Sequence, residues 1–243
     1  MQDGLKNVSS NINSFLMIGQ SNMAGRGHFD EVEPIKNKLC HMLRMGRWQA
    51  MSEPINPDRV IFNPSWHSGI SLGASFADDF AKYTGCPVGM IPCADGGTSI
   101  DQWMPGEILY DHAVMMTKLA MRSSNFSGIL WHQGESDCAE AKRILYKEKF
   151  ITMITAMRRD LGNENIPVII GELGTNVIGY KEDEDPVKMN AVFYEIAKTI
   201  PMCAVVSSEG FTLNSDGIHF DSKSLRIFGS RYFEAYRKLV SEN

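Results

Sequence analysis

Apolar and polar positions along the chain follow two alternating patterns. Short uninterrupted apolar runs are typical of strands buried on both faces of a parallel sheet. Between these runs, apolar residues recur every three or four positions, as in amphipathic helices. The expected strands cover residues 15–18, 87–91, 128–131, 167–170 and 203–207. The expected helices cover residues 72–83, 107–122, 140–161, 186–199 and 225–239. The alternation predicts an α/β fold, a three-layer α/β/α sandwich around five parallel strands.

The same spacing assigns inner faces to the helices. It places Met115 on the buried face of helix 107–122 and Ile144 on the buried face of helix 140–161. Asp137 and Glu140 have the spacing of a capping box, so we expect them to begin the latter helix.

Residues 26–70 contain four prolines and no helical period, so we expect a long irregular insertion within one domain that spans residues 1–243. The tryptophans Trp48 and Trp66 favour an ordered loop that faces the substrate over a disordered one, because disordered segments are poor in aromatic residues. The charged stretch at residues 181–185 is interpreted only as a solvated acidic turn.

Composition narrows the function classes. The 43% hydrophobic and 22% charged residues are typical of a globular protein, and the net charge of −5 argues against nucleic acid or an anionic membrane as main partner. The five cysteines are widely spaced and odd in number, which indicates reduced thiols rather than a disulfide framework. Without a basic and apolar leader, the expected location is cytoplasmic, or secreted if a signal peptide was removed. Oligomeric state is left open.

A candidate nucleophile follows the first strand. Ser21 comes after Gly19, where the sheet ends and a helix would begin, so backbone N–H groups lie beside its hydroxyl. A base is also required. His219 is the best placed histidine, because Asp216, three residues earlier in the same tight loop, can bind its Nδ1 and leave Nε2 facing the serine. The polar stretches that carry these candidate residues each follow a predicted strand, and the carboxyl ends of parallel strands meet at one edge of the sheet.

The negative charge of an acyl-transfer intermediate also needs hydrogen-bond donors. The sequence offers the backbone N–H of Ser21, an N–H in Gly96-Gly97 and the side-chain amide of Gln133. Glu135 has two interpretations: it either braces its own loop or competes with Asp216 to orient His219.

Four motifs occur in order along the chain: Gly19-Gln20-Ser21-Asn22-Met23, Gly96-Gly97-Thr98-Ser99, His132-Gln133-Gly134-Glu135-Ser136 and Asp216-Gly217-Ile218-His219. Together they resemble the blocks of the SGNH hydrolase superfamily, and most closely its sialate O-acetylesterase-like branch, which includes acetylxylan esterases of carbohydrate esterase family 6. The resemblance implies a flavodoxin-like fold, a Ser–His–Asp triad, removal of acetyl groups from carbohydrates, and no metal or cofactor. Gln20 and Asn22, within the first motif, are expected to bind substrate.

The expected function is therefore a serine O-acetylesterase that acts on acetylated xylo-oligosaccharides through an acetyl-enzyme. An α/β-hydrolase is disfavoured because Met23 occupies the second glycine position of Gly-x-Ser-x-Gly. A metal-dependent deacetylase is disfavoured because the histidines are scattered. The alternatives left open are a sialate O-acetylesterase, an acyltransferase with the same triad, and a non-catalytic sugar-binding protein with stacking platforms at Trp48, Trp66 and Trp103.

Overall fold

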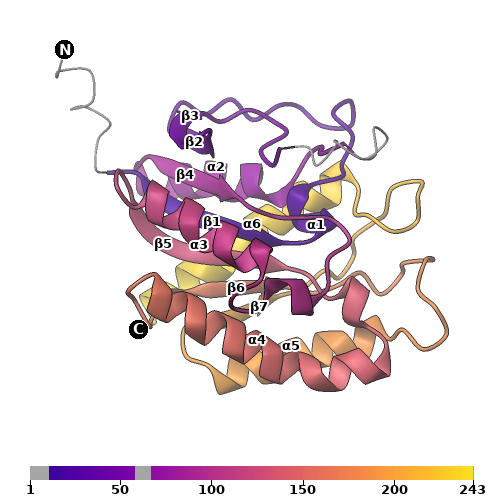
Figure 1. Ribbon diagram of the computed structural model, residues 1–243. Coiled ribbons are helices and arrows are strands. Elements are labelled where there is room, and N and C mark those ends of the chain that lie inside the picture. Colours follow the sequence, from indigo (N-terminus) through magenta and orange to yellow (C-terminus); the bar gives the residue numbers. More distant parts are fainter. Residues whose placement is uncertain (1–10, 58–66, 243) are drawn as a thin grey trace, which may run out of the picture.

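One mostly parallel sheet organises the structure. The computed structural model describes residues 11–57 and 67–242, and its sheet has seven strands in the order β3-β2-β4-β1-β5-β6-β7 (Figure 1). The parallel strands expected from the sequence are β1 (Asn13–Gly19), β4 (Val88–Pro92), β5 (Asn125–His132), β6 (Val168–Gly171) and β7 (Cys203–Val206). Each pairs with its neighbours in parallel register, with β1 at the centre between β4 and β5.

The expectation of only five strands is wrong, because residues 26–70 contribute two more. Strand β2 (Cys40–Arg44) lies parallel to β4, and β3 (Arg47–Ala50) pairs with β2 in antiparallel register. The turn between them has positive φ at Met45 (48°) and Gly46 (72°), as a two-residue hairpin requires. Strand β3 is short, mostly exposed and at the sheet edge, so its sequence lacks the apolar run that marks the inner strands.

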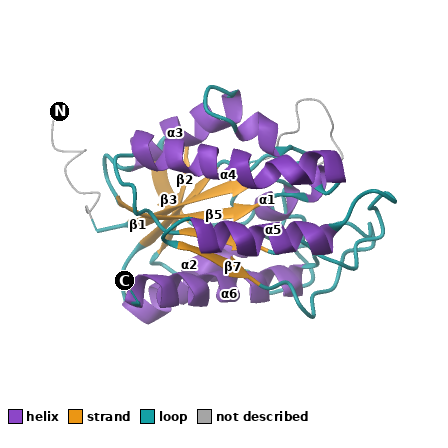
Figure 2. Cartoon of the chain, turned by 90° about the horizontal axis from the view of Figure 1, so that it is seen from below, coloured by secondary structure: helices purple, strands orange, loops and turns teal. Residues whose placement is uncertain are grey.

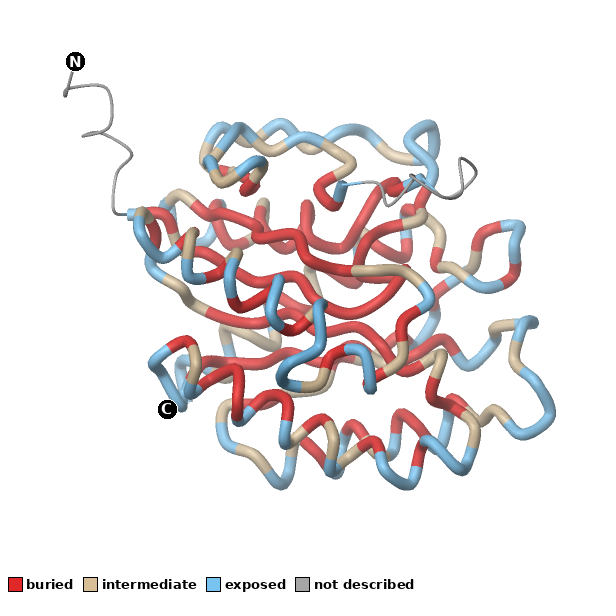
Figure 3. Tube along the Cα trace, in the orientation of Figure 1, coloured by how far each residue is buried: buried red, intermediate tan, exposed pale blue. Residues whose placement is uncertain are grey.

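Helices cover both faces of the sheet (Figure 2), which confirms the three-layer architecture. One face packs against α2 (Leu72–Thr84) and α6 (Ser222–Ser241), and the other against α3 (Ile108–Ala120), α4 (Glu140–Asp160) and α5 (Pro186–Thr199). Because side chains alternate along a strand, β1 sends Phe15 and Met17 to the first face and Leu16 and Ile18 to the second. All four are fully buried, and the buried strands run through the centre of Figure 3.

Two helical details differ from the sequence expectation. Met115 and Ile144 are 58% and 70% exposed, because their helices instead turn neighbouring residues, such as Val114 and Tyr146, toward the sheet. Helix α4 begins after Ala139 without a side-chain cap, so the expected capping box is also wrong. Asp137 lies before that helix, in the 3₁₀ turn η3 (Glu135–Asp137). Its carboxylate accepts hydrogen bonds from Ile100 N–H and Gln133 Nε2 instead of capping the helix.

The topology brings the polar motifs together. Strands β1, β4 and β5 end at the same edge of the sheet, where ligands bind in folds of this kind. Among the described residues, no helix has the length and apolar character needed to cross a bilayer.

Candidate active site

Ser21 lies immediately after the central strand. Gln20 N–H donates to the carbonyl of His132 (2.8 Å), which fixes the end of β1 against β5. The contact needs a glycine before it, because Gly19 has φ +128° and a Cβ there would lie 2.1 Å from the His132 oxygen. Ser21 then begins α1 (Ser21–Ala24), and the residue is 8% exposed. The sharp turn thus places the Ser21 hydroxyl at the edge of the sheet, where the residue lines the cavity.

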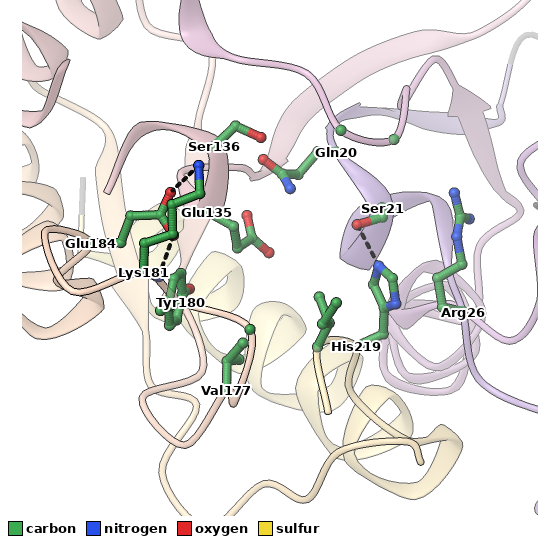
Figure 4. Close-up of a pocket in the computed structure, with 14 residues that line it drawn as sticks. Gln20, Ser21, Arg26, Glu135, Ser136, Val177, Tyr180, Lys181, Glu184 and His219 are labelled. Carbon is green, nitrogen blue, oxygen red and sulfur yellow. Dashed lines mark hydrogen bonds and ion pairs between the residues drawn. The ribbon is translucent and has the colours of Figure 1, made fainter. Parts of the chain in front are cut away.

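His219 connects Ser21 to Asp216. Its Nε2 lies 2.8 Å from Ser21 Oγ, and its Nδ1 lies 2.8 Å from Asp216 Oδ2 (Figure 4 shows the first contact). The other carboxylate oxygen of Asp216 accepts the backbone N–H groups of Ile218 (2.9 Å) and His219 (3.0 Å). With Nδ1 donating to Asp216, Nε2 is left as an acceptor for the serine proton.

The surroundings of Asp216 keep it ionised. Partial burial alone would raise the pKa of this carboxyl, but the N–H groups and imidazole of His219, and the N–H of Ile218, outweigh that effect. The net result is a pKa below the ordinary value of aspartate. A charged Asp216 can therefore stabilise an imidazolium on His219.

The glycine pair after β4 lies against the serine. A Cβ on Gly96 would be 3.6 Å from Ser21 Cβ and only 2.8 Å from Arg26 Nη2, so a larger residue would displace the arginine. The next residue, Gly97, has φ +74°. No described residue accepts a hydrogen bond from the backbone N–H of Ser21 or of Gly97. Both N–H groups belong to residues that line the cavity.

Gln133 does not reach the cavity, so its expected role as a direct oxyanion donor is not supported by its position. The side chain is fully buried, and its Nε2 donates to Thr98 O (2.9 Å) and Asp137 Oδ2 (2.6 Å). Its Oε1 accepts the hydroxyl of Tyr146 (2.8 Å). Both ends of the amide are thus bound within the protein, and Gln133 supports the loop that carries Gly96 and Gly97.

Gln20 presents its own amide to the cavity instead. Its Oε1 lies 3.3 Å from Gln133 Nε2, which directs the Gln20 nitrogen away from Gln133 and into the cavity beside Ser21 (Figure 4). The expectation that Gln20 meets substrate therefore agrees with its position.

Asn22 and Glu135 connect the motifs behind the serine. Asn22 is 2% exposed and does not line the cavity, so its position does not support the expectation that it binds substrate. Its Nδ2 donates to Glu135 Oε1 (2.9 Å) and its Oδ1 accepts the N–H of Phe220 (3.1 Å), the residue after His219. Glu135 lines the cavity, but the carboxylate that contacts His219 is that of Asp216.

Comparison with known proteins is consistent with this geometry. A family model described as "Carbohydrate esterase, sialic acid-specific acetylesterase" matches residues 11–238. The chain belongs to this family. The resemblance to this branch of the SGNH hydrolases is thereby confirmed, and the protein is a carboxylic ester hydrolase.

Individual relatives are distant in sequence and near in structure. "Probable carbohydrate esterase At4g34215" of Arabidopsis thaliana is 26% identical over 245 residues, which cover 91% of this chain and 89% of the relative. Its X-ray structure has a TM-score of 0.81 at 25% identity, covering 94% of this chain and 98% of the other. The crystal structure of NanS has a TM-score of 0.75 at 16% identity, with 97% and 99% covered. At that identity the likeness shows the fold alone.

The cavity of this esterase has a volume of about 380 Å³, within the usual range of small-molecule sites. Ser21, His219 and the glycine pair form one end. The opposite wall comes from the segment after β6, with Val177, Gly179, Tyr180, Lys181 and Glu184. This wall was missed from the sequence, where residues 181–185 are interpreted as a solvated turn. The charged residues indicate a solvated turn, so Tyr180, which directly precedes them, was not predicted to line a cavity.

The tryptophans expected at the site lie elsewhere or are not described. Trp48 packs over Gly89 in the sheet, where a Cβ on that glycine would be 2.4 Å from its ring, and it does not line the cavity. Trp103 is fully buried and donates to Thr98 Oγ1 (3.0 Å), so it cannot serve as a stacking platform. Trp66 lies outside the described residues. Among the described residues, Tyr180 is the aromatic side chain at the cavity.

A buried histidine lies behind the site. The Nε2–H of His132 donates to Glu172 O (3.2 Å), and its Nδ1 is 3.7 Å from Glu135 Oε1. Burial lowers the pKa of His132, although the nearby Glu135 opposes this shift.

Within residues 11–57 and 67–242, no group of three His, Cys, Asp or Glu side chains is arranged to hold a metal ion.

Proposed function

We propose that this esterase is a serine carbohydrate O-acetylesterase that removes acetyl groups from acetylated oligosaccharides through an acetyl-enzyme. The observation that carries the proposal is the continuous pair of 2.8 Å contacts from Ser21 Oγ to His219 and from His219 to Asp216, at the end of a cavity of sugar-sized volume. The membership of a carbohydrate esterase family supports the same class of substrate.

In the first half-reaction, His219 Nε2 takes the Ser21 proton while Oγ attacks the acetyl carbonyl carbon. The resulting oxyanion lies near the backbone N–H groups of Ser21 and Gly97, with the Gln20 amide as a third donor. His219 then gives the proton to the sugar oxygen as the bond between that oxygen and the carbonyl carbon breaks. The free sugar hydroxyl leaves, and the acetyl group stays on Ser21.

In the second half-reaction, water takes the place of the sugar. His219 removes a proton from the water, and the water oxygen attacks the acetyl carbon. The oxyanion collapses, Ser21 Oγ leaves with the proton from His219, and acetate is released. Asp216 stays ionised throughout and pairs with the imidazolium formed in each half.

Two substrate classes deserve direct comparison. Acetylated xylo-oligosaccharides are our first candidate, on the resemblance of the four motifs to acetylxylan esterases. Acetylated sialic acids are the second, because the matching family model is described as sialic acid-specific.

Acetate release from a panel of acetylated xylo-oligosaccharides and O-acetyl sialic acids tests the proposal, with Ser21→Ala as the matched control. We expect hydrolysis of at least one class by the wild type and none above background by the variant. A variant as active as the wild type, or a wild type inert on every acetylated sugar, contradicts the proposal. An added unacetylated sugar that becomes acetylated identifies an acyltransferase instead.

A further inference from the structure

The geometry of the catalytic end fixes where the alcohol part of the ester must lie. His219 has to reach the leaving oxygen, whereas the carbonyl oxygen points to the N–H groups of Ser21 and Gly97. The sugar therefore extends over the residues that adjoin His219 on the cavity side. These are Ile218, which directly precedes the histidine, and Val177 across from it (Figure 4 labels Val177).

We propose that Val177, Tyr180 and Ile218 form a leaving-group subsite that takes the C–H face of a pyranose ring. This inference rests on the proposed function and names the part of the cavity that selects the alcohol. Ile218 is 42% exposed and Tyr180 adds an aromatic ring, so apolar surface is presented to the ligand beside the histidine. Exposed apolar side chains gathered at a cavity are typical of binding sites.

The wall is attached to the catalytic loops at both ends. On one side, Ile178 N–H donates to Gly217 O (2.9 Å), and the Ile178 side chain lies 3.3 Å from where a Gly217 Cβ would be. On the other side, Asp185 N–H donates to Cys138 O (3.2 Å), close to the Glu135 turn. Because both attachments are to segments that carry site residues, the wall holds a fixed position relative to His219.

The outer part of the wall is polar. Lys181 N–H donates to Glu184 Oε2 (2.8 Å), and the Lys181 ammonium lies 4.0 Å from Glu184 Oε1 with 79% of the side chain exposed. An ammonium and a carboxylate at this position can bind the hydroxyl groups of a sugar whose C–H face rests on Val177 and Ile218. The subsite thus matches the two kinds of surface of a pyranose.

Cyclohexyl acetate and methyl acetate test the apolar part without assuming which sugar is native. Both carry the same acetyl group, but only cyclohexyl acetate has an apolar ring that can pack against the subsite. We expect the wild type to prefer cyclohexyl acetate, and Val177→Ser to reduce the ratio of the two kcat/KM values by roughly tenfold, mostly through KM. Ile227→Ser, at an equally apolar surface position on α6 (50% exposed), is the control and leaves the ratio unchanged.

Each outcome separates this inference from the proposed function. An unchanged ratio in Val177→Ser, with both esters still hydrolysed, overturns the subsite and leaves the esterase intact. Equal losses on both esters also overturn it, because the residue then acts on the catalytic groups. A wild type that hydrolyses acetylated sugars but neither of these esters also overturns the subsite, whereas a wild type inert on acetylated sugars and on both esters overturns the proposed function itself. For the polar part, Lys181→Met is expected to impair an acetylated methyl xyloside severalfold more than cyclohexyl acetate, and an equal effect on both removes Lys181 from the subsite.

Discussion

Two aspartates at the same edge of the sheet have opposite surroundings. Asp216 lies in an exposed loop, and hydrogen bonds from His219 and Ile218 outweigh its partial burial, so its pKa is lowered. Asp137 is fully buried, and burial raises its pKa although Gln133 and the Ile100 N–H partly offset this. The comparison teaches that the carboxylate that orients the catalytic histidine is kept ionised in an accessible loop, whereas the buried carboxyl belongs to the polar network that holds the neighbouring loops in place.

Asp216→Asn removes the accessible carboxylate of this comparison, the one that contacts His219, and has the largest expected effect. The amide can present its NH₂ group to Nδ1 and favour the wrong tautomer of His219, so kcat should fall by about 10⁴-fold. Melting temperature should fall only modestly, because the amide oxygen of asparagine can still accept the N–H groups of Ile218 and His219. Steady-state kinetics and thermal unfolding measure both, with the exposed Asp30→Asn as control. A loss below about tenfold contradicts the assignment of Asp216 as the partner of His219.

The two glutamines sharpen the comparison, because one faces the cavity and the other lies behind it. Gln20→Ala removes a donor at the developing oxyanion, so kcat should fall by roughly 10²-fold at nearly unchanged stability. Gln133→Ala removes one hydrogen bond from each of the buried groups of Thr98, Asp137 and Tyr146, so the free energy of unfolding should fall by about 2 kcal/mol or more. Its kcat should fall only about tenfold, through a less ordered Gln20.

Kinetics and urea unfolding of both glutamine variants give the result. The reverse pattern, a stable Gln133→Ala with kcat lowered by roughly 10²-fold or more, would assign the oxyanion contact to Gln133 after all.

Glu135→Gln has a smaller expected effect on rate. The substituted side chain keeps an oxygen that can accept the Asn22 amide, and Asp216 rather than Glu135 contacts His219. We expect kcat to fall less than about tenfold. Glu135→Ala removes the acceptor altogether and should cost about 1–3 kcal/mol of stability. If Glu135→Gln damages kcat more than Asp216→Asn does, the roles of the two acids must be exchanged.

The pH dependence of stability should separate the two aspartates by sign. A lowered pKa means that Asp216 stabilises the fold above the ordinary aspartate value of about 3.9, and this is lost as pH falls through its folded pKa. A raised pKa means that ionised Asp137 weakens the fold above that value, and the penalty disappears as pH falls toward it.

Chemical unfolding from about pH 3 to about pH 7 tests this, because the range includes the ordinary aspartate pKa of about 3.9. The stability of Asp137→Asn relative to wild type should rise with pH above about 3.9. The stability that Asp216 contributes relative to Asp216→Asn should shrink only below it. The same slope for both pairs would contradict the contrast.

The parts of the site that could be predicted from the sequence are those fixed by local chain geometry. Ser21 follows a buried strand directly, and Asp216 and His219 share one tight loop, so their proximity needs only the parallel topology. The direction of the Gln133 side chain could not be predicted, because an amide at a strand end can point to the cavity or to the core. Its contacts with Thr98, Asp137 and Tyr146, which depend on the tertiary fold, decide this.

The fold shows the same division. The inner strands are continuous apolar runs and could be located, whereas the edge hairpin β2–β3 is short and half exposed, with no periodic signal. Trp48 looked suited to a sugar, but its ring covers Gly89, a contact between residues far apart in the sequence. Tyr180 was overlooked for the opposite reason, since its charged neighbours resemble an ordinary solvated turn.

The central claim is that Ser21 is the nucleophile activated by His219. Labelling with a fluorophosphonate, followed by peptide mapping in a mass spectrometer, tests it most directly, with His219→Ala treated in parallel. The account predicts one label on the peptide that contains Ser21, loss of acetate release in proportion to labelling, and little label in His219→Ala. A label on another serine, or full acetate release with Ser21 labelled, would contradict it.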